Sequence, residues 1–213
     1  MTLKIKAVLF DMDGVLIDAR EWHYEAFNLA LAVFGLTISR ADHLASFDGL
    51  PTSKKLHMMS TERGLPRQLH QLIGQIKQQH TEALIYTHCR PQFAQQFALA
   101  RLQDAGYRIA VCSNSIRSSV AMMLGRADLL RYLDFFLSSE DIALPRPAPD
   151  IYRAAIERLG LAPAQCLVVE DNHNGVTAAR AAGAHVLQVA TVDEVRLDNI
   201  LAAIARHEQE VPV

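Results

Sequence analysis

Short apolar runs alternate with longer stretches of helical periodicity along this sequence, and the alternation restricts the chain to few folds. The apolar runs are rich in Val, Ile, Leu or Phe and occupy residues 5–10, 108–112, 134–137, 166–169 and 185–189. Runs of this length with polar or Gly/Pro borders are typical of buried strands. The helical patterns between them, each followed by a glycine, cover residues 90–105, 149–159 and 174–182. Such alternation predicts an α/β fold in which a parallel sheet has helices on both faces.

A long interruption follows the first apolar run. Residues 17–88 contain no convincing strand and show helical patterns at residues 21–34, 52–63 and 66–86. We therefore expect a Rossmann-like three-layer sandwich with an inserted α-helical cap domain. The predicted core domain comprises residues 1–16 and 89–213, and the predicted cap comprises residues 17–88. The first cap helix has an apolar stripe, which we expect to pack into the hydrophobic core rather than line a ligand pocket. This stripe consists of Trp22, Ala26, Leu29, Ala30 and Val33.

Composition excludes several classes of partner. Half of the 213 residues are hydrophobic, and 21 basic against 23 acidic side chains give a formal net charge of −2. This balance predicts no surface for nucleic acid or for an anionic membrane. No apolar run approaches the roughly 18 residues that a membrane-spanning helix needs. The three cysteines are widely spaced and odd in number, which indicates reduced thiols in a cytoplasmic protein. Both a monomer and a homodimer remain open.

Polar clusters follow the predicted strands at four places. They are Asp11-Met12-Asp13-Gly14, Ser113-Asn114-Ser115, Arg146 between two prolines, and Glu170-Asp171. In an open parallel sheet, ligands bind beyond the carboxyl ends of the strands, which lie at one edge. The sequence therefore predicts that the four clusters belong to one site.

The acidic residues of the first and last clusters indicate a divalent cation. Asp11 and Asp13 are two residues apart, so both carboxylates can face the same side of an extended chain. Burying close like charges is costly unless a cation is present. Together with Glu170 and Asp171 they would supply hard oxygen ligands from two strand ends, and such ligands suit Mg²⁺.

The second and third clusters indicate an anion. The hydroxyl and backbone N–H groups of Ser113 and Asn114 are suited to holding phosphate oxygens at a strand-to-helix junction. Alternatively, these two residues only cap the helix expected to begin near Ile116. The prolines beside Arg146 stiffen its loop and would fix where the cation points, although an arginine there could also point into solvent.

Taken together, these motifs resemble the haloacid dehalogenase superfamily, and most closely its branch with a helical cap after the first strand, which includes the β-phosphoglucomutase-like phosphatases. The matching segments, in chain order, are residues 11–18, 113–114, 145–150, 170–175 and 178–183. They span nearly the whole chain. The resemblance implies Mg²⁺-dependent hydrolysis of a small, sugar-like phosphate monoester through a phosphoaspartate.

The same resemblance assigns roles to individual residues. It makes Asp11 the nucleophile that attacks the phosphoryl group. Asp13 would be the general acid and then the general base, and would also offer its backbone carbonyl to the metal. Ser113 would hold a phosphoryl oxygen, while Glu170 and Asp171 would complete the Mg²⁺ site with Asp11.

One position departs from the family pattern. The third motif normally carries lysine, and this chain has Arg146, which keeps the charge but has a planar fork in place of a point charge. Two rival interpretations therefore stay open: a phosphomutase, which shares these motifs, and a degenerate, non-catalytic phosphate-binding protein. Dehalogenation is not expected, because the dehalogenases of the family lack the second aspartate of the first motif.

Substrate contacts are expected from Asn114 in the core and from His23, Thr52 and Lys54 in the cap. The loop at residues 48–55 joins two cap helices, and in related proteins this loop reaches the active site and helps to select the substrate. His23 could instead pack between helices, and Lys54 could be a solvated surface residue. The expected partner is a small phosphorylated metabolite.

Overall fold

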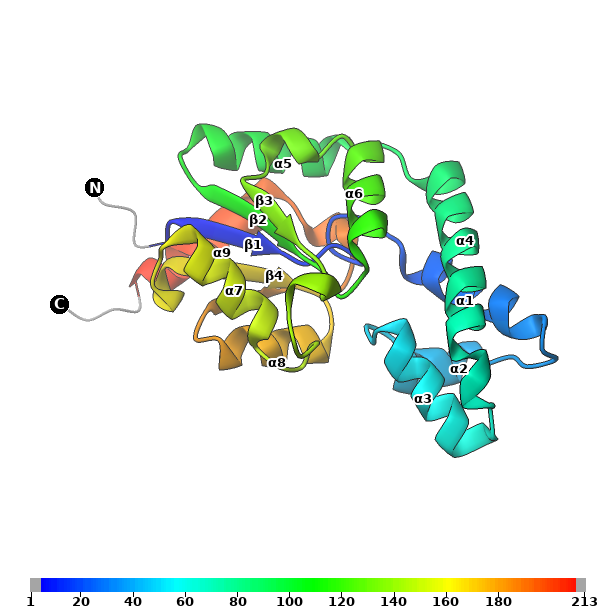
Figure 1. The fold of residues 1–213 in the computed structure, drawn as a ribbon. Helices are drawn as coiled ribbons and strands as arrows, with labels where there is room; N and C mark the ends of the chain where they lie inside the picture. Colours follow the sequence, from blue (N-terminus) through cyan, green and yellow to red (C-terminus); the bar gives the residue numbers. More distant parts are fainter. Residues whose placement is uncertain (1–4, 210–213) are drawn as a thin grey trace. The chain divides into compact units, whose positions relative to one another are not determined.

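The computed structural model describes residues 5–209. Five parallel strands form one sheet in the order β3-β2-β1-β4-β5 (Figure 1). The strands are β1 (Ala7–Phe10), β2 (Arg108–Cys112), β3 (Phe135–Leu137), β4 (Cys166–Glu170) and β5 (His185–Gln188). Each falls on a predicted apolar run, and the helices between them cover both faces of the sheet. The predicted Rossmann-like α/β architecture is confirmed.

The first strand lies in the middle of the sheet. Phe10, its last residue, is in register with Val111 of β2 and Val169 of β4. The backbone N–H of Asp11 still donates to Val169 O at 3.0 Å, and that of Ser113 donates to Leu137 O at 3.0 Å. The polar residues that follow β1, β2 and β4 therefore emerge at one edge of the sheet.

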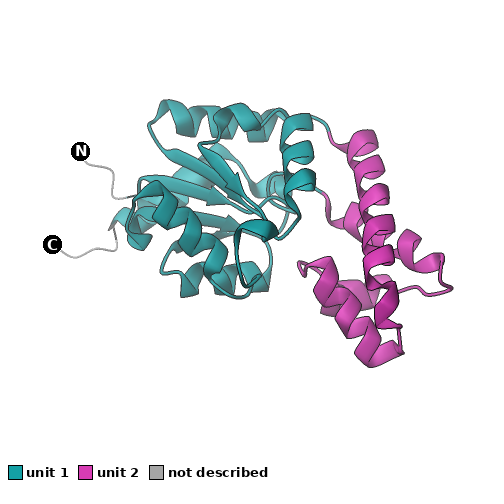
Figure 2. Ribbon diagram, in the orientation of Figure 1, with its two compact units in different colours: residues 1–18, 90–213 teal, residues 19–89 magenta. Residues whose placement is uncertain are grey.

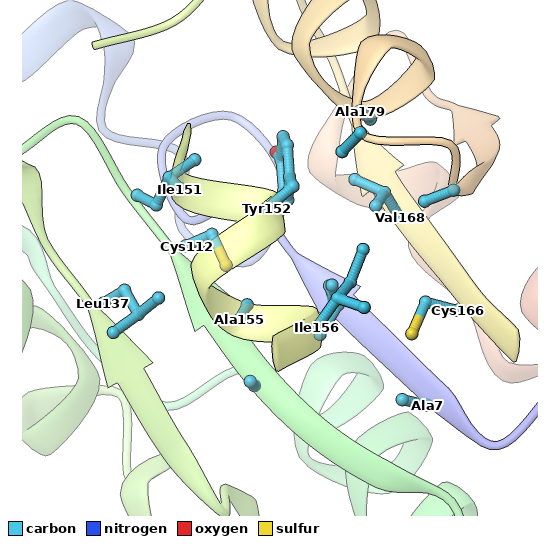
Figure 3. Packing of buried hydrophobic residues seen from close by; sticks show 14 of the residues in the cluster. Ala7, Cys112, Leu137, Ile151, Tyr152, Ala155, Ile156, Cys166, Val168 and Ala179 are labelled. Carbon is cyan, nitrogen blue, oxygen red and sulfur yellow. The ribbon is translucent and has the colours of Figure 1, made fainter. Parts of the chain in front are cut away.

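One face of the sheet packs against helices α7 (Asp150–Leu159) and α8 (His173–Ala181) (Figure 3). Alternate strand residues point into this layer, as the period of two requires. The strands contribute Ala7, Leu9, Ala110, Cys112, Cys166 and Val168, and α7 contributes Ile151, Tyr152, Ala155 and Ile156. The helix ends at Gly160, whose φ of 66° is the left-handed conformation that glycine adopts without strain.

The opposite face carries α5 (Phe93–Asp104) and α9 (Leu197–Gln209), while α6 (Arg117–Arg126) follows β2 (Figure 1). Buried side chains on α5 and α9 include Ala98, Leu99, Leu102, Ile200, Ala203 and Ile204. The sequence patterns above did not include α9. Its apolar residues recur at helical spacing between Leu197 and Ala205, and its charged residues Asp198, Arg206 and Glu208 lie toward the two ends of the helix.

The chain divides into two compact units, residues 1–18 with 90–213 and residues 19–89 (Figure 2). The second unit is helical, with α1 (Arg20–Ala32), α2 (Arg40–Asp42), a π-helical turn at His43–Phe47, α3 (Thr52–Arg63) and α4 (His70–His88). Its own apolar core includes Phe27, Leu31, Phe47, Met59 and Ile73.

The predicted apolar stripe of α1 is partly wrong. Leu29 and Val33 are 41% and 65% exposed, whereas Phe27 and Leu31 are fully buried beside Ala30. Apolar residues occur on more than one side of this helix, so periodicity alone does not decide which side faces the core. The larger Phe27 and Leu31 side chains fill the core of the unit instead.

All three cysteines are free thiols and buried, as the sequence predicted. Burial raises the pKa of the Cys166 thiol to about 11. Within residues 5–209, none of the helices combines the length and the apolar character that crossing a bilayer demands.

Candidate active site

The site begins where β1 ends. Asp11 follows the central strand and is only 1% exposed, and two residues further on the Oδ2 atom of Asp13 accepts a hydrogen bond from Ser115 Oγ at 3.0 Å. Gly14 has a φ of 88°, a conformation that L side chains rarely adopt. This glycine lets the chain turn directly after the two aspartates, so that both stay at the edge of the sheet.

Arg146 points into the site and is 4% exposed. Its Nη2 atom donates to Asp11 Oδ1 at 2.9 Å, and its Nη1 atom donates to Glu170 Oε1. The fork of the guanidinium thus joins a carboxylate at the end of β1 to one at the end of β4. The alternative that Arg146 only points into solvent is wrong.

Glu170 is fully buried, and protein donors meet both of its carboxylate oxygens. Tyr152 Oη donates to Oε1 at 2.6 Å, beside the Arg146 contact. The Oε2 atom accepts from the backbone N–H of Asp171 at 3.0 Å. Across the carboxylate lies Gly175, where an added Cβ would overlap both Oε1 and Cδ of Glu170. A side chain larger than hydrogen at Gly175 would therefore displace the Glu170 carboxylate.

Asp11, Glu170 and Asp171 form a cluster in which one carboxylate oxygen of each residue lies within 4.8 Å of the others. Hard oxygen donors at this spacing fit a cation such as Mg²⁺ or Ca²⁺. The chemistry of the donors is therefore compatible with the metal site that the sequence predicted. The side chain of Asp13 is not part of this cluster, and the metal contact of its backbone carbonyl stays a prediction.

The electrostatics of the site follow from its burial. Burial raises the pKa of the Asp11 carboxyl well above its usual range, against the opposing attraction of the Arg146 guanidinium. Repulsion from Glu170 and Asp171 acts in the same direction as burial. Burial by itself would lower the pKa of Arg146, but Asp11 and Glu170 hold it well above its ordinary value, so the guanidinium stays charged. Arg146 thus contacts two of the three clustered carboxylates, and a bound divalent cation would further offset the negative charge of the cluster.

Ser113 and Asn114 follow β2 at the same edge of the sheet. Ser113 is fully buried, and its Oγ atom accepts from the backbone N–H of Ser115 at 3.1 Å. The next helix, α6, has Ile116 at its N-cap and no side-chain capping hydrogen bond. Neither Ser113 nor Asn114 occupies the N-cap position of this helix, and their contact with phosphate stays a prediction.

The substrate residues predicted in the cap lie in the second unit. His23 is half-buried on α1, and its Nδ1 atom lies 3.2 Å from Lys77 Nζ on α4. Thr52 begins α3, Lys54 is exposed and the neighbouring Lys55 is buried. Their roles toward substrate stay predictions.

Sequence reasoning missed Tyr152 as a polar member of the site. The residue occupies a core position of an amphipathic helix, and its ring is packed accordingly among apolar side chains. The available signal was a tyrosine in place of phenylalanine on a helix face that is otherwise apolar, since a buried hydroxyl requires a partner.

Comparison with known proteins places this geometry in a family. The family model for haloacid dehalogenase-like hydrolases matches residues 8–189. The phosphoglycolate phosphatase of Nitrosospira multiformis is 30% identical over 190 residues, covering 88% of this chain and 84% of that protein. A phosphorylated carbohydrates phosphatase of Thermotoga maritima is 26% identical over 185 residues, covering 84% and 82%.

Solved structures agree with this assignment at the level of the fold. The crystal structure of β-phosphoglucomutase from Clostridium difficile matches with a TM-score of 0.83 and 18% identity, covering 97% of this chain and 100% of that one. The buried cluster of Asp11, Arg146, Glu170 and Asp171 lies within the matched residues 8–189. The match of the family model shows that the chain belongs to the haloacid dehalogenase-like hydrolases.

Proposed function

We propose that this chain is a cytoplasmic, Mg²⁺-dependent phosphatase that hydrolyses a small, sugar-like phosphate monoester through a phosphoaspartate on Asp11. The observation that carries the proposal is the buried arrangement of Asp11 between Arg146 and the carboxylates of Glu170 and Asp171. The phosphatase names of two relatives support the same reaction class. The carbohydrate phosphatase of Thermotoga maritima favours a sugar-like substrate.

The proposed reaction has two steps. A carboxylate oxygen of Asp11 attacks phosphorus, the bond between phosphorus and the ester oxygen breaks, and Asp13 gives its proton to the departing oxygen. Asp13 then takes a proton from water, whose oxygen attacks phosphorus and releases the Asp11 carboxylate with inorganic phosphate. The hydrogen bond from Ser115 Oγ to Asp13 Oδ2 holds this carboxyl in a defined orientation beside β2.

Electrostatic stabilisation comes from the residues around Asp11. Arg146 neutralises charge that develops on the transferred group, and Ser113 donates its hydroxyl to a phosphoryl oxygen. Asp11, Glu170 and Asp171, with the backbone carbonyl of Asp13, would hold Mg²⁺, which when bound offsets the negative charge of the phosphoryl group.

We also propose that the helical unit is a cap that selects the substrate, with contacts from His23, Thr52 and Lys54, while Asn114 contributes from the core. The contact between Arg146 and Asp11 supports an enzyme over a protein that only binds phosphate, because it directs a cation at the nucleophile. Two relatives with phosphatase names support hydrolysis, whereas the likeness to β-phosphoglucomutase, at 18% identity, concerns the fold alone.

Replacement of Asp11 by Asn tests the proposal, because it preserves the shape of the side chain and removes the attacking charge. Turnover of p-nitrophenyl phosphate with Mg²⁺ should fall by several orders of magnitude, while circular dichroism stays unchanged. Beryllium fluoride should inhibit the wild-type protein by imitating the bound phosphoryl group. The matched control is Asp104→Asn, at an exposed position at the end of α5, which should retain wild-type turnover. An Asp11→Asn variant that keeps about a tenth of the activity would contradict covalent catalysis.

A further inference from the structure

Tyr152 is a tyrosine at a position where phenylalanine would satisfy the packing. Its ring lies on the sheet-facing side of α7 among Ile151, Ala155 and Ile156 (Figure 3). The residue is 0% exposed and is among the largest fully buried side chains of the described chain. Burying a hydroxyl is costly unless it forms hydrogen bonds. The hydrogen bonds of the hydroxyl must therefore offset the cost of burying it.

Both contacts of that hydroxyl lead into the candidate site. Tyr152 Oη donates to Glu170 Oε1 at 2.6 Å, and Arg146 Nη1 donates to Tyr152 Oη at 3.5 Å. Arg146 Nη1 also donates to Glu170 Oε1. The three side chains form a closed triangle in which Glu170 Oε1 has a neutral donor from α7 and a charged donor from the Arg146 loop.

This triangle restricts the rotation of the Glu170 carboxylate. The backbone N–H of Asp171 donates to the other oxygen, Oε2, at 3.0 Å. The carboxylate also occupies the space that a side chain at position 175 would fill. One carboxylate oxygen of Glu170 lies close to one carboxylate oxygen each of Asp11 and Asp171. Its orientation therefore decides whether the three oxygens converge.

We propose that Tyr152 is a positioning residue that acts through Glu170 and sets the affinity of the carboxylate cluster for a divalent cation. This inference rests on the proposed function, because it concerns the metal site of the proposed phosphatase. Hydrogen-bond partners behind metal ligands typically alter affinity by about 10- to 100-fold. The hydroxyl of Tyr152 contacts Glu170 and Arg146 rather than the proposed nucleophile Asp11.

Mn²⁺ alone tests the inference without substrate, since it accepts oxygen ligands like those of Mg²⁺ and is visible by electron paramagnetic resonance. The dissociation constant of Mn²⁺ should rise about 10-fold in Tyr152→Phe. The matched control is Tyr107→Phe, which removes the hydroxyl of a tyrosine that is 8% exposed and precedes β2, at the opposite edge of the sheet. That control should bind Mn²⁺ as the wild type does, and thermal unfolding should show both variants folded. An unchanged dissociation constant in folded Tyr152→Phe would overturn the inference.

A second measurement uses the tyrosine itself and needs no loss of the hydroxyl. The protein is prepared with 3-fluorotyrosine incorporated at position 152, or at position 107 as control, and is titrated with Mg²⁺. The fluorine resonance at position 152 should shift and saturate with the metal, while that at position 107 stays constant. If the fluorine resonance at position 152 did not shift on addition of Mg²⁺, the inference would be contradicted, even if Tyr152→Phe failed to fold.

These outcomes separate the inference from the proposed function. A wild-type protein that binds Mn²⁺ but hydrolyses no phosphate ester would contradict the proposed function, and the comparison of Tyr152→Phe with Tyr107→Phe would still decide the role of Tyr152. An active wild-type protein with equal Mn²⁺ affinity in both variants would contradict only the inference. A wild-type protein that binds no divalent cation would contradict both.

Discussion

Arg146 Nη2 lies 2.9 Å from Asp11 Oδ1, although 135 positions separate the two residues in the sequence. Both side chains are buried, and the second nitrogen of the same guanidinium contacts Glu170. A lysine would bring one compact ammonium to this place, whereas the arginine fork bridges two carboxylates at once. The departure from the family pattern therefore preserves a cation at the nucleophile and adds a link between the ends of β1 and β4.

Arg146→Ala should lower kcat/KM for p-nitrophenyl phosphate by about 10- to 1000-fold, the scale of removing one positioned electrostatic group. It should also reduce the free energy of unfolding by about 3–5 kcal/mol, because Asp11 and Glu170 keep buried charge without their partner. Steady-state kinetics and urea unfolding measure the two effects.

Arg146→Lys is the matched variant for this test. It retains the charge and restores the usual residue of the family, so its kcat/KM should equal or exceed that of the wild type. An alanine variant with wild-type kcat/KM would remove Arg146 from the mechanism. A wild type without turnover that gains activity only with lysine would instead support the non-catalytic interpretation.

Removal of divalent cations should abolish hydrolysis, because the cluster of Asp11, Glu170 and Asp171 then holds more negative charge than the guanidinium of Arg146 alone offsets. Mg²⁺ should restore turnover better than Ca²⁺, and Ca²⁺ should inhibit, since it is larger and takes more ligands at longer distances. Initial rates after exhaustive chelation and metal replacement check this. Full activity in the chelated protein would exclude a metal from the reaction.

Gly175→Ala should disrupt the site, because the added methyl group would overlap the Glu170 carboxylate. Glu170 would have to leave its contacts with Tyr152 and Arg146, so both turnover and thermal stability should fall. Gly74→Ala in α4 is the matched control, since nothing lies within 4 Å of a Cβ there. That variant should be more stable by about 1 kcal/mol, as expected for alanine in a helix interior. Wild-type activity in Gly175→Ala would show that Glu170 needs no fixed orientation.

His43 should make the protein less stable in mild acid. Burial first, and then the charge of Lys55, lowers its pKa from 6.5 to about 4. Between those values the unfolded chain binds a proton that the folded chain does not, so the free energy of unfolding should fall as the pH drops through this window. For one such group the loss reaches about 3 kcal/mol.

Urea unfolding of the wild type and of His43→Gln, at several pH values between 4 and 7, measures the contribution of this residue. Glutamine carries no titrating proton, so the stability of the variant should depend less on pH across the window. Equal pH dependence in both proteins would show that His43 takes up a proton in the folded state as readily as in the unfolded state.

The sheet and the two aspartates of the first motif could be predicted from the sequence, because both depend on local patterns. An apolar run of strand length followed by Asp11-Met12-Asp13-Gly14 places its carboxylates at the end of β1 once that run is buried. The helix boundary at Gly160 was equally readable, since a glycine commonly adopts the left-handed conformation at a helix end.

The contacts within the site could not be predicted in the same way. The position of Arg146 between Asp11 and Glu170 depends on the path of a loop and on how far a long side chain reaches, and neither is encoded in a motif. Tyr152 is a core residue by its periodicity, and only the three-dimensional contact with Glu170 shows that its hydroxyl belongs to the site. The face of α1 was misjudged at Leu29 and Val33 because several sides of the helix are apolar.

The central place of β1 in the sheet has a consequence for synthesis on the ribosome. Both neighbours of β1 come later in the chain, at residues 108–111 and 166–169, and residues 19–89 are made between them and the first strand. The growing polypeptide must therefore keep an apolar segment unpaired while the helical unit emerges, a stage at which exposed strand edges favour aggregation. A chain that stalls before Glu170 carries Asp11 but none of the carboxylates that complete its cluster. We therefore expect catalytic competence to appear only after β4 and the residues that directly follow it have been made.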